Sequence, residues 1–295
     1  SAVISLQSDG REIGRWCGRL VPERPLHTEL EIDGDPQDVE VVLKEIGENE
    51  GVILRHIPAK MAIAPRPATA AEPDLPENIR SSDELYLVGL HLEQYRHATR
   101  EPAPYWLEAV RRDNSDSRCN HALGRWHLRR GEFSIAERYL RTAIERLTER
   151  NPNPYDGEPY YKLGLTLNYQ GRISEAYEAF YKSAWNSAWR GPAYHRLAEI
   201  DCGRSQWENA LDHLDRSLRA DADNLNARNL KTMVLGRLGR NQEASNLLSA
   251  TCELDPLDNW SRYLNARTKP LDGQQRLDFA FDLLRANLLA DAADV

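Results

Sequence analysis

The chain has 295 residues, of which 41% are hydrophobic and 28% charged, and its formal net charge is −8. No apolar run approaches the ~18–20 residues that a membrane-spanning helix needs, so we do not expect a membrane protein. The opening residues, SAVISLQSDG, lack the basic start and apolar stretch of a secretion signal, which favours a cytoplasmic location.

The distributions of charge and of cysteines argue against two further kinds of protein. Residues 1–80 carry a net charge of −6 (9 basic, 15 acidic) and residues 81–295 a net charge of −2 (29 basic, 31 acidic). Neither part has the basic excess that binding to a phosphate backbone requires, so nucleic acid is not an expected partner. The four cysteines are far apart and form no C-x-x-C pair, so we expect reduced thiols and no zinc ribbon.

Residues 1–60 are predicted to form a small β-rich module. Apolar residues alternate with polar ones in the strand pattern at Leu26, Thr28, Leu30 and Ile32, and again at Val39, Val41 and Leu43. The sequence GENEG at 47–51 suits a hairpin loop between strands at 38–46 and 52–58. About five strands fit in this stretch, fewer than the seven of an immunoglobulin-type sandwich. The sandwich-like module is therefore either small or truncated, lacking its first strands.

Residues 61–80 are expected to be a linker. Prolines recur from Pro58 to Pro76 among alanines, which favours a stiff, extended connection on the surface. From Ser82 onward the apolar period changes from two to about 3.6, so helices are predicted over residues 81–295.

The helical part repeats every 34 to 40 residues. One unit matches the tetratricopeptide-repeat (TPR) signature, at Tyr160, Leu163, Gly164, Leu167, Ala176 and Phe180. Equivalent positions recur in the neighbouring units, at Gly89, Gly124, Ala136, Tyr194, Ala210 and Ala244. Two antiparallel helices approach closely where one presents Gly or Ala, which explains the small residues. We therefore predict a mostly α fold: a TPR-type α-solenoid, a right-handed superhelix of helix pairs, preceded by the β module.

Two features depart from the regular repeat. An insertion at residues 151–156 (NPNPYD) predicts a loop on one edge of the solenoid. Near the C-terminus a helix is expected from about Gln274, with an apolar stripe at Leu277, Phe281, Leu284 and Leu288. This stripe is expected to fold back on the previous unit or to form a homodimer contact.

Several stretches resemble one bacterial family: LHLEQYRHAT (90–99), PYWLEAVRRD (104–113), NPNPYDGEPYYKLG (151–164) and the run 184–202. In that multidomain family a galactose-mutarotase-like β domain is followed by β-rich structure and TPR repeats. The resemblance covers roughly residues 80–295 and implies a carbohydrate connection. It supplies no catalytic residue for this chain.

Motifs that carry catalysis or cofactor binding are missing from the sequence. No H-E-x-x-H, Walker loop, G-x-G-x-x-G or G-x-S-x-G occurs. The histidine pairs His91/His97 and His121/His127 are six residues apart, not the four that place two ligands on one helix face. We therefore expect no enzyme, no cofactor and no metal site.

Residues that line the groove can be inferred from the repeat register. In TPR arrays the first helix of each pair lines the concave surface, and positions one turn apart share a face. The expected partner-binding residues are Arg118, His121, Arg125, Glu158, Tyr161, Asn168, His195, Glu199, Asn226 and Asn229. They form either a solvated face or a binding groove.

Two further segments are weighed in the same way. Glu93, Gln94 and His97 either cap the first helix against the β module or face a ligand. Trp185, Trp189 and Arg190 either pack in the core or offer a stacking platform for a sugar ring.

Together these features favour an interaction scaffold that binds a peptide or protein partner through the concave groove. The alternative is an accessory region of a carbohydrate-active multidomain protein whose catalytic or sugar-binding domain lies upstream.

Overall fold

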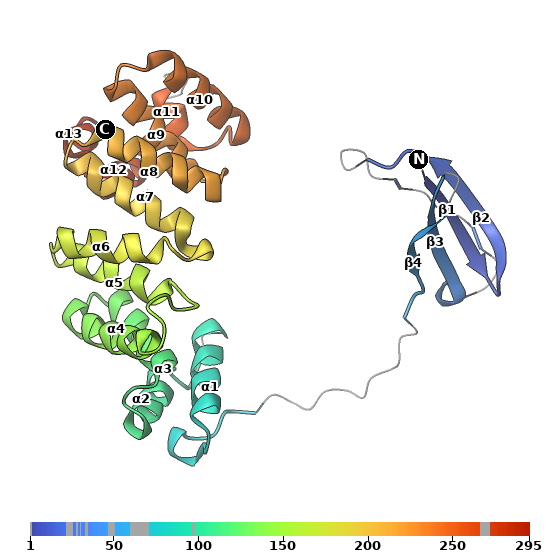
Figure 1. Ribbon diagram of the computed structural model, residues 1–295, viewed down its shortest axis with the longest axis horizontal. Coiled ribbons are helices and arrows are strands. Elements are labelled where there is room, and N and C mark those ends of the chain that lie inside the picture. The colour runs from blue at the N-terminus through green and yellow to red at the C-terminus, as the bar shows by residue number, and fades with distance from the viewer. Residues whose placement is uncertain are drawn as a thin grey trace. The chain divides into compact units, whose positions relative to one another are not determined.

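The computed structural model describes residues 2–21, 26, 27, 29, 31, 32, 35–46, 51–59, 71–95, 98–265 and 272–295 (Figure 1). The chain forms two compact units, Ser1–Glu72 and Pro73–Val295. The first unit is the β-rich module, and the second holds the thirteen α-helices of the described residues. The first half of the expected linker, residues 61–70, lies outside the described part.

The β unit is a four-stranded antiparallel sheet in the order β2-β1-β3-β4. Its strands are β1 (Ala2–Ser8), β2 (Arg11–Gly18), β3 (Val39–Glu45) and β4 (Val52–His56). The predicted hairpin between 38–46 and 52–58 corresponds to β3 and β4, while loop residues 47–50 lie outside the described residues. Asp9 and Gly10 both have positive φ, the backbone of a tight two-residue hairpin turn between β1 and β2.

The strand expected at residues 26–32 does not form at its described positions, where Leu26 and Ile32 belong to no strand. Pro22, Pro25 and Pro36 bracket this segment, and prolines cannot donate to a sheet ladder. Leu26 and Ile32 instead line a cavity of about 530 Å³ with Ile4, Trp16 and Val41 of the sheet. The β unit therefore has four strands among its described residues, one fewer than the pattern predicted.

Residues 73–80, expected to be linker, belong to the helical unit. The hydroxyl of Tyr105 donates to the carbonyl of Asp74 (2.9 Å), and the Arg112 guanidinium donates to the carbonyls of Pro76 and Ile79. Ile79 is buried in the core of the first helix pair. The helical unit thus begins about eight residues before its first helix.

Consecutive helices of the second unit form antiparallel pairs that stack one after another (Figure 1). The first pairs are α1 (Ser82–Tyr95) with α2 (Ala103–Arg112), α3 (Ser117–Arg129) with α4 (Phe133–Thr148), and α5 (Glu158–Tyr169) with α6 (Ile173–Ser183). They are followed by α7 (Ser187–Gly203) with α8 (Trp207–Ala220), and α9 (Leu225–Arg237) with α10 (Asn241–Leu254). The C-terminal helices are α11 (Asn259–Leu264), α12 (Gly273–Arg285) and α13 (Leu289–Asp294). The predicted TPR-type fold with an N-terminal β module is confirmed.

Capping residues mark where several helices of this unit begin and end. Asp116 and Asn224 each accept a hydrogen bond from a backbone N–H in the first turn of the helix that follows. Gly131, Gly171 and Gly239 end first helices with φ between +72° and +75°, a conformation that glycine adopts without strain. In the α7–α8 turn Ser205 takes the same role at φ +57°.

Close approach within each pair depends on the missing side chains of particular glycines. A Cβ added at Gly164 would lie 2.6 Å from the Phe180 ring, and one at Gly124 would lie 2.6 Å from Leu140. At Gly89 it would meet the Trp106 indole at 2.3 Å. The large residue of the second helix therefore sits directly on the glycine of the first, and the two recur 16 positions apart in α3–α4 and α5–α6 and 17 apart in α1–α2.

Overpacking this crossing is expected to destabilise the fold. Ala176 on α6 is fully buried beside the Gly164–Phe180 contact. Ala176→Leu should lower the free energy of unfolding by about 1–3 kcal/mol, because the added atoms have no space. Exposed Ala222 between α8 and α9 is the control, since Ala222→Leu should change stability by less than about 0.5 kcal/mol. Urea denaturation measures both, and an unchanged midpoint for Ala176→Leu would contradict the register.

The C-terminal apolar stripe is corrected by the structure. Of its four residues only Leu288 is buried, at 6% exposure, while Leu277, Phe281 and Leu284 are 45–56% exposed. The side of α12 that enters the core carries Phe279, Leu283 and Ala286. Phe279 contacts the rings of Trp260 and Tyr263 on α11, which decide the face that α12 turns inward. The helix folds back on preceding units, but with the opposite face.

Candidate groove in the helical unit

An ionic network joins the first helices of the first three pairs. Glu93 on α1 forms ion pairs with Arg125 and Arg129 on α3. Arg125 also lies 3.7 Å from Glu158 at the start of α5, and Lys162, one turn further, lies 3.6 Å from the same carboxylate. The repeat brings these side chains together because neighbouring first helices α1, α3 and α5 are in contact.

Four of the five side chains in the network are largely withdrawn from water, whereas Arg129 is 54% exposed. The side chains of Glu93, Arg125, Glu158 and Lys162 keep only 11–24% of their exposure. Burial lowers the pKa of Lys162, although the nearby Glu158 carboxylate acts in the opposite direction. Partly buried charges need partners, so removing one member leaves another uncompensated. These residues are therefore held in place and do not form a solvated face.

His121, predicted to face the groove, lies beneath this network. Its Nε2 atom is buried, has no hydrogen-bond partner among the residues that the structure describes, and lies 3.9 Å from Glu158. Burial, followed by the positive charges of Arg125 and Lys162, lowers the pKa of His121 to about 3. The imidazole is therefore neutral at physiological pH.

Two cavities flank the network. One of about 200 Å³ is lined by Arg125, Leu128, Arg129, Glu158 and Lys162. The other, of about 410 Å³, is lined by Leu92, Glu93, Arg100, Glu101, Pro102, Trp126 and Arg129. Arg129 borders both. Sequence reasoning missed Arg129 and Lys162, although each is one turn from a residue that it selected, and that spacing was the available signal.

Arg118 lies at the start of α3 and outside both cavities. It forms ion pairs with Asp83 of α1 and Asp116, and its guanidinium lies 5.3 Å from the centre of the Tyr86 ring. Its side chain remains about half exposed. Arg118 thus ties α3 to the start of α1, and it does not converge with Arg125.

Tyr161 does not offer the exposed aromatic surface that its position predicted. It is 9% exposed and packs between Phe180 and Trp189, with ring centres 5.6 Å and 4.9 Å away. Its hydroxyl accepts a hydrogen bond from Arg196 of α7 at 3.5 Å. The first-helix position is inward-facing here because the long α7 covers it from the next repeat.

The α7 end of the expected groove is covered. Glu199 is 7% exposed, accepts from Arg196 at 2.7 Å and lies 3.7 Å from His195. Burial lowers the pKa of His195, while the carboxylates of Glu199 and Asp282 act in the opposite direction. Asp282 belongs to α12, and a Cβ at Gly203 of α7 would meet Asn287 at 2.7 Å. The C-terminal helices therefore cover this part of α7.

The three asparagines of the predicted groove differ in their exposure to solvent. Asn168 is half-buried, and Asn226 is exposed near the start of α9. Asn229 is fully buried and donates to Asp258 at 2.7 Å, which couples α9 to the cap of α11. Of the secondary candidates, Glu93 belongs to the network, Gln94 is exposed, and His97 lies outside the described residues.

One group of residues has the spacing of metal ligands. His121, Asp156 and Glu158 each offer a ligand atom, and these atoms lie within 4.8 Å of one another. Arg125 and Lys162, however, lie within 3.7 Å of the same Glu158 carboxylate. Two cations already lie close to this carboxylate, so a metal ion would gain little electrostatic energy here.

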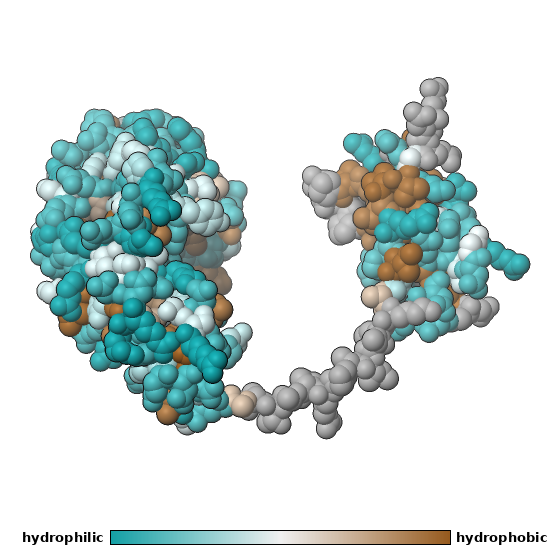
Figure 2. Space-filling view, turned by 60° about the horizontal axis from the view of Figure 1, so that its bottom comes forward, coloured by the Kyte–Doolittle hydropathy of each residue, from teal (hydrophilic) through white to brown (hydrophobic). Residues whose placement is uncertain are grey.

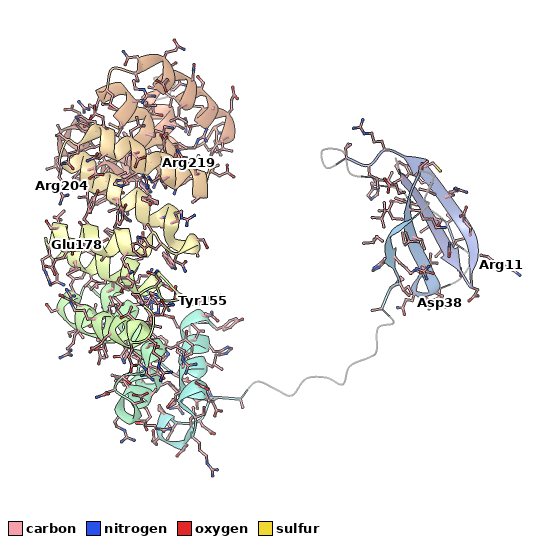
Figure 3. All side chains as sticks on the ribbon, in the orientation of Figure 1. Arg11, Asp38, Tyr155, Glu178, Arg204 and Arg219 are labelled. Carbon is pink, nitrogen blue, oxygen red and sulfur yellow. The ribbon has the colours of Figure 1, made fainter. Side chains whose placement is uncertain are left out.

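Of the two tryptophans weighed above, one packs in the core and the other is exposed. Trp189 packs on Tyr161, at the edge of the hydrophobic core that contains Phe180. Trp185 is 57% exposed, with the Lys182 ammonium 3.9 Å from its ring centre. It lines a cavity of about 220 Å³ beside the inserted loop, where Asn186 donates to the Tyr155 carbonyl. Tyr155 itself projects from the helical unit and is 98% exposed (Figure 3).

No protein-family model matches the sequence. Among solved structures, the chain is similar to Pseudomonas aeruginosa pilF, with 16% identity and a TM-score of 0.53 over 72% of this chain and 97% of that one. It is also similar to YrrB, described as a TPR protein with an unusual peptide-binding site (12% identity, TM-score 0.51, 63% and 92% coverage). A third similar structure is the MamA protein, with 12% identity and a TM-score of 0.50 over 65% of this chain and 98% of that one. These similarities show the TPR-like fold of the helical unit. They do not extend to the mutarotase-like domain or to the multidomain family.

Helices long and apolar enough to span a membrane are not found in the part of the chain that the structure describes. The visible face of the helical unit is mainly hydrophilic, with apolar residues in small separate spots (Figure 2).

Proposed function

We propose that the helical unit is an interaction scaffold that binds a peptide or protein segment along α1, α3 and α5. The observation that carries the proposal is the half-buried network of Glu93, Arg125, Arg129, Glu158 and Lys162 between two cavities. Solenoid folds commonly bind extended segments along the surface of their first helices. YrrB, which shares the fold, is described as having a peptide-binding site. A catalytic role has no comparable support, and a cytoplasmic location agrees with the four free cysteines.

The chemistry of the network defines the partner. Arg125 and Arg129 present guanidinium groups that suit a carboxylate, but Glu93 already occupies both. A ligand carboxylate must therefore share or replace Glu93. Arg125 and Lys162 already pair with Glu158, so a basic ligand group gains little near α5. We infer a segment of mixed polarity, with one acidic group near α3 and a neutral polar group near α5.

Calorimetry with a panel of peptides and oligosaccharides tests this proposal. An Arg125→Ala/Arg129→Ala variant should weaken binding of any peptide ligand by about 2–4 kcal/mol, because two convergent donors are lost. Arg141→Ala/Arg146→Ala on α4 is the matched control, since both arginines are half exposed on a second helix. Equal loss in both variants, or no loss in the first, would contradict the groove.

The alternative, a carbohydrate-linked accessory role, depends on Trp185. Its exposed ring lies beside the amides of Asn153 and Asn186, groups that suit a sugar face and its hydroxyls. In the same panel, an oligosaccharide that binds the wild type and is lost in Trp185→Ala would favour this function over the peptide groove.

A further inference from the structure

The helix α12 is apolar on two opposite sides. Phe279, Leu283 and Ala286 enter the core with Trp260, whereas Leu277 and Phe281 are each 56% exposed. At about 100° per residue, the exposed stripe of Leu277, Phe281 and Leu284 lies roughly opposite the buried one. A helix that is apolar on both sides is normally covered on both. The described residues of the chain cover only one.

The residues beside the exposed stripe carry a recognisable pattern. Asp278 and Arg285 lie on one flank, two turns apart, and Gly273 and Ala280 lie on the other. Asp278 accepts a hydrogen bond from Gln274 but forms no ion pair with any residue that the structure describes. Arg285 is 59% exposed and pairs with Asp282. One flank thus offers an acidic and a basic group, and the other offers room for a close neighbour.

We propose that this stripe is a self-association surface on which α12 of a second copy packs antiparallel. Two-fold symmetry brings the same flank of both helices together. Asp278 and Arg285 are equidistant from a point next to Phe281, so a crossing there sets each Asp278 level with Arg285 of the other copy. The interface then contains two such ion pairs around a centre formed by Phe281 from both chains. This inference is independent of the proposed groove function.

The size of the stripe limits the strength of the dimer. From Leu277 to Leu284 it spans about 10 Å of helix. A single helix pair of this length falls below the ~1,200 Å² that stable interfaces bury. We therefore expect reversible dimerisation with a dissociation constant on the order of 10–100 μM.

Sedimentation equilibrium of the full chain, from about 1 μM to 1 mM, tests the surface. The wild type should change from monomer to dimer with concentration. Phe281→Asp should raise the dissociation constant at least about 100-fold, since the symmetry buries two carboxylates against each other. Leu257→Asp, at a residue that is 78% exposed outside the stripe, should leave dimerisation unchanged.

A charge exchange separates the antiparallel arrangement from unspecific apolar contact. Asp278→Arg alone sets arginine against arginine twice and should weaken the dimer about tenfold or more. Adding Arg285→Asp restores opposite charges and should recover most of that loss. A wild type that stays monomeric at 1 mM, a dimer indifferent to Phe281→Asp, or a double variant weaker than Asp278→Arg would each overturn the proposal. Circular dichroism of every variant verifies that the fold is intact.

Discussion

Replacing Phe180 by alanine is expected to lower the free energy of unfolding by about 3–5 kcal/mol. The ring is 1% exposed and sits on the backbone of Gly164, where a Cβ would be 2.6 Å from it. It also contacts the Tyr161 ring at 5.6 Å between centres. Because Gly164 lies inside α5 with its backbone bonded in the helix, it cannot move to fill the cavity. Both the transfer cost and the cavity cost therefore apply.

Tyr181, the next residue on α6, provides the control. It is 42% exposed, so Tyr181→Ala should cost less than about 1 kcal/mol. Chemical denaturation of the two variants and the wild type measures the difference. If Phe180→Ala is no more destabilising than Tyr181→Ala, the ring is not the residue that holds the α5–α6 crossing.

The second large effect is a loss of stability in acid that depends on His121. Its pKa is about 3 in the folded chain, because burial and the neighbouring cations disfavour the imidazolium, while an unfolded histidine titrates near 6.5. Between these values the unfolded chain binds the extra proton, so stability rises with pH and falls on acidification. Lowering the pH from 7 to 4 should cost about 2–3 kcal/mol through this residue alone.

Two substitutions isolate this contribution. His121→Gln removes the titration but keeps a polar side chain, and His121→Phe removes it while keeping a ring of similar size. Both should reduce the slope of stability against pH between 4 and 7 by the same amount. Wild-type and variant curves that run parallel over this range would show that His121 titrates alike in both states, against its burial under Arg125 and Lys162.

Much of the fold could be predicted from the sequence, because it depends on features within each helix pair. Gly164 and Phe180 have equivalents at nearly the same spacing in the two preceding helix pairs, because those helices approach each other equally closely. Gly171 and its equivalents end first helices because only a residue tolerant of positive φ fits there. These constraints are local, so sequence reasoning could locate the helix pairs. It could not see that Ser205 replaces glycine in one turn.

The candidate site was harder to predict from the sequence than the fold was. Glu93, Arg125 and Glu158 were all selected as candidates to face a ligand, with a helix cap or a solvated face as the alternative, whereas they pair with one another. Tyr161 and Asn229 were placed on the same surface, yet both are buried. A helical period gives the direction of a side chain relative to its own helix. Whether that direction meets solvent depends on the neighbouring helices, here α7 beside Tyr161 and α11 beside Asn229.

By itself, the sequence determined that this protein is a TPR-type solenoid behind a β module, because small residues, turn glycines and the 34-residue period act within one repeat. The tertiary structure alone decided which charges meet across repeats, that His121 lies beneath them, and which face of α12 remains exposed. The physical reason is that burial and ion pairing depend on contacts between different helices, such as that between Glu93 and Arg125, 32 positions apart. The amphipathic pattern of a single helix does not specify such contacts.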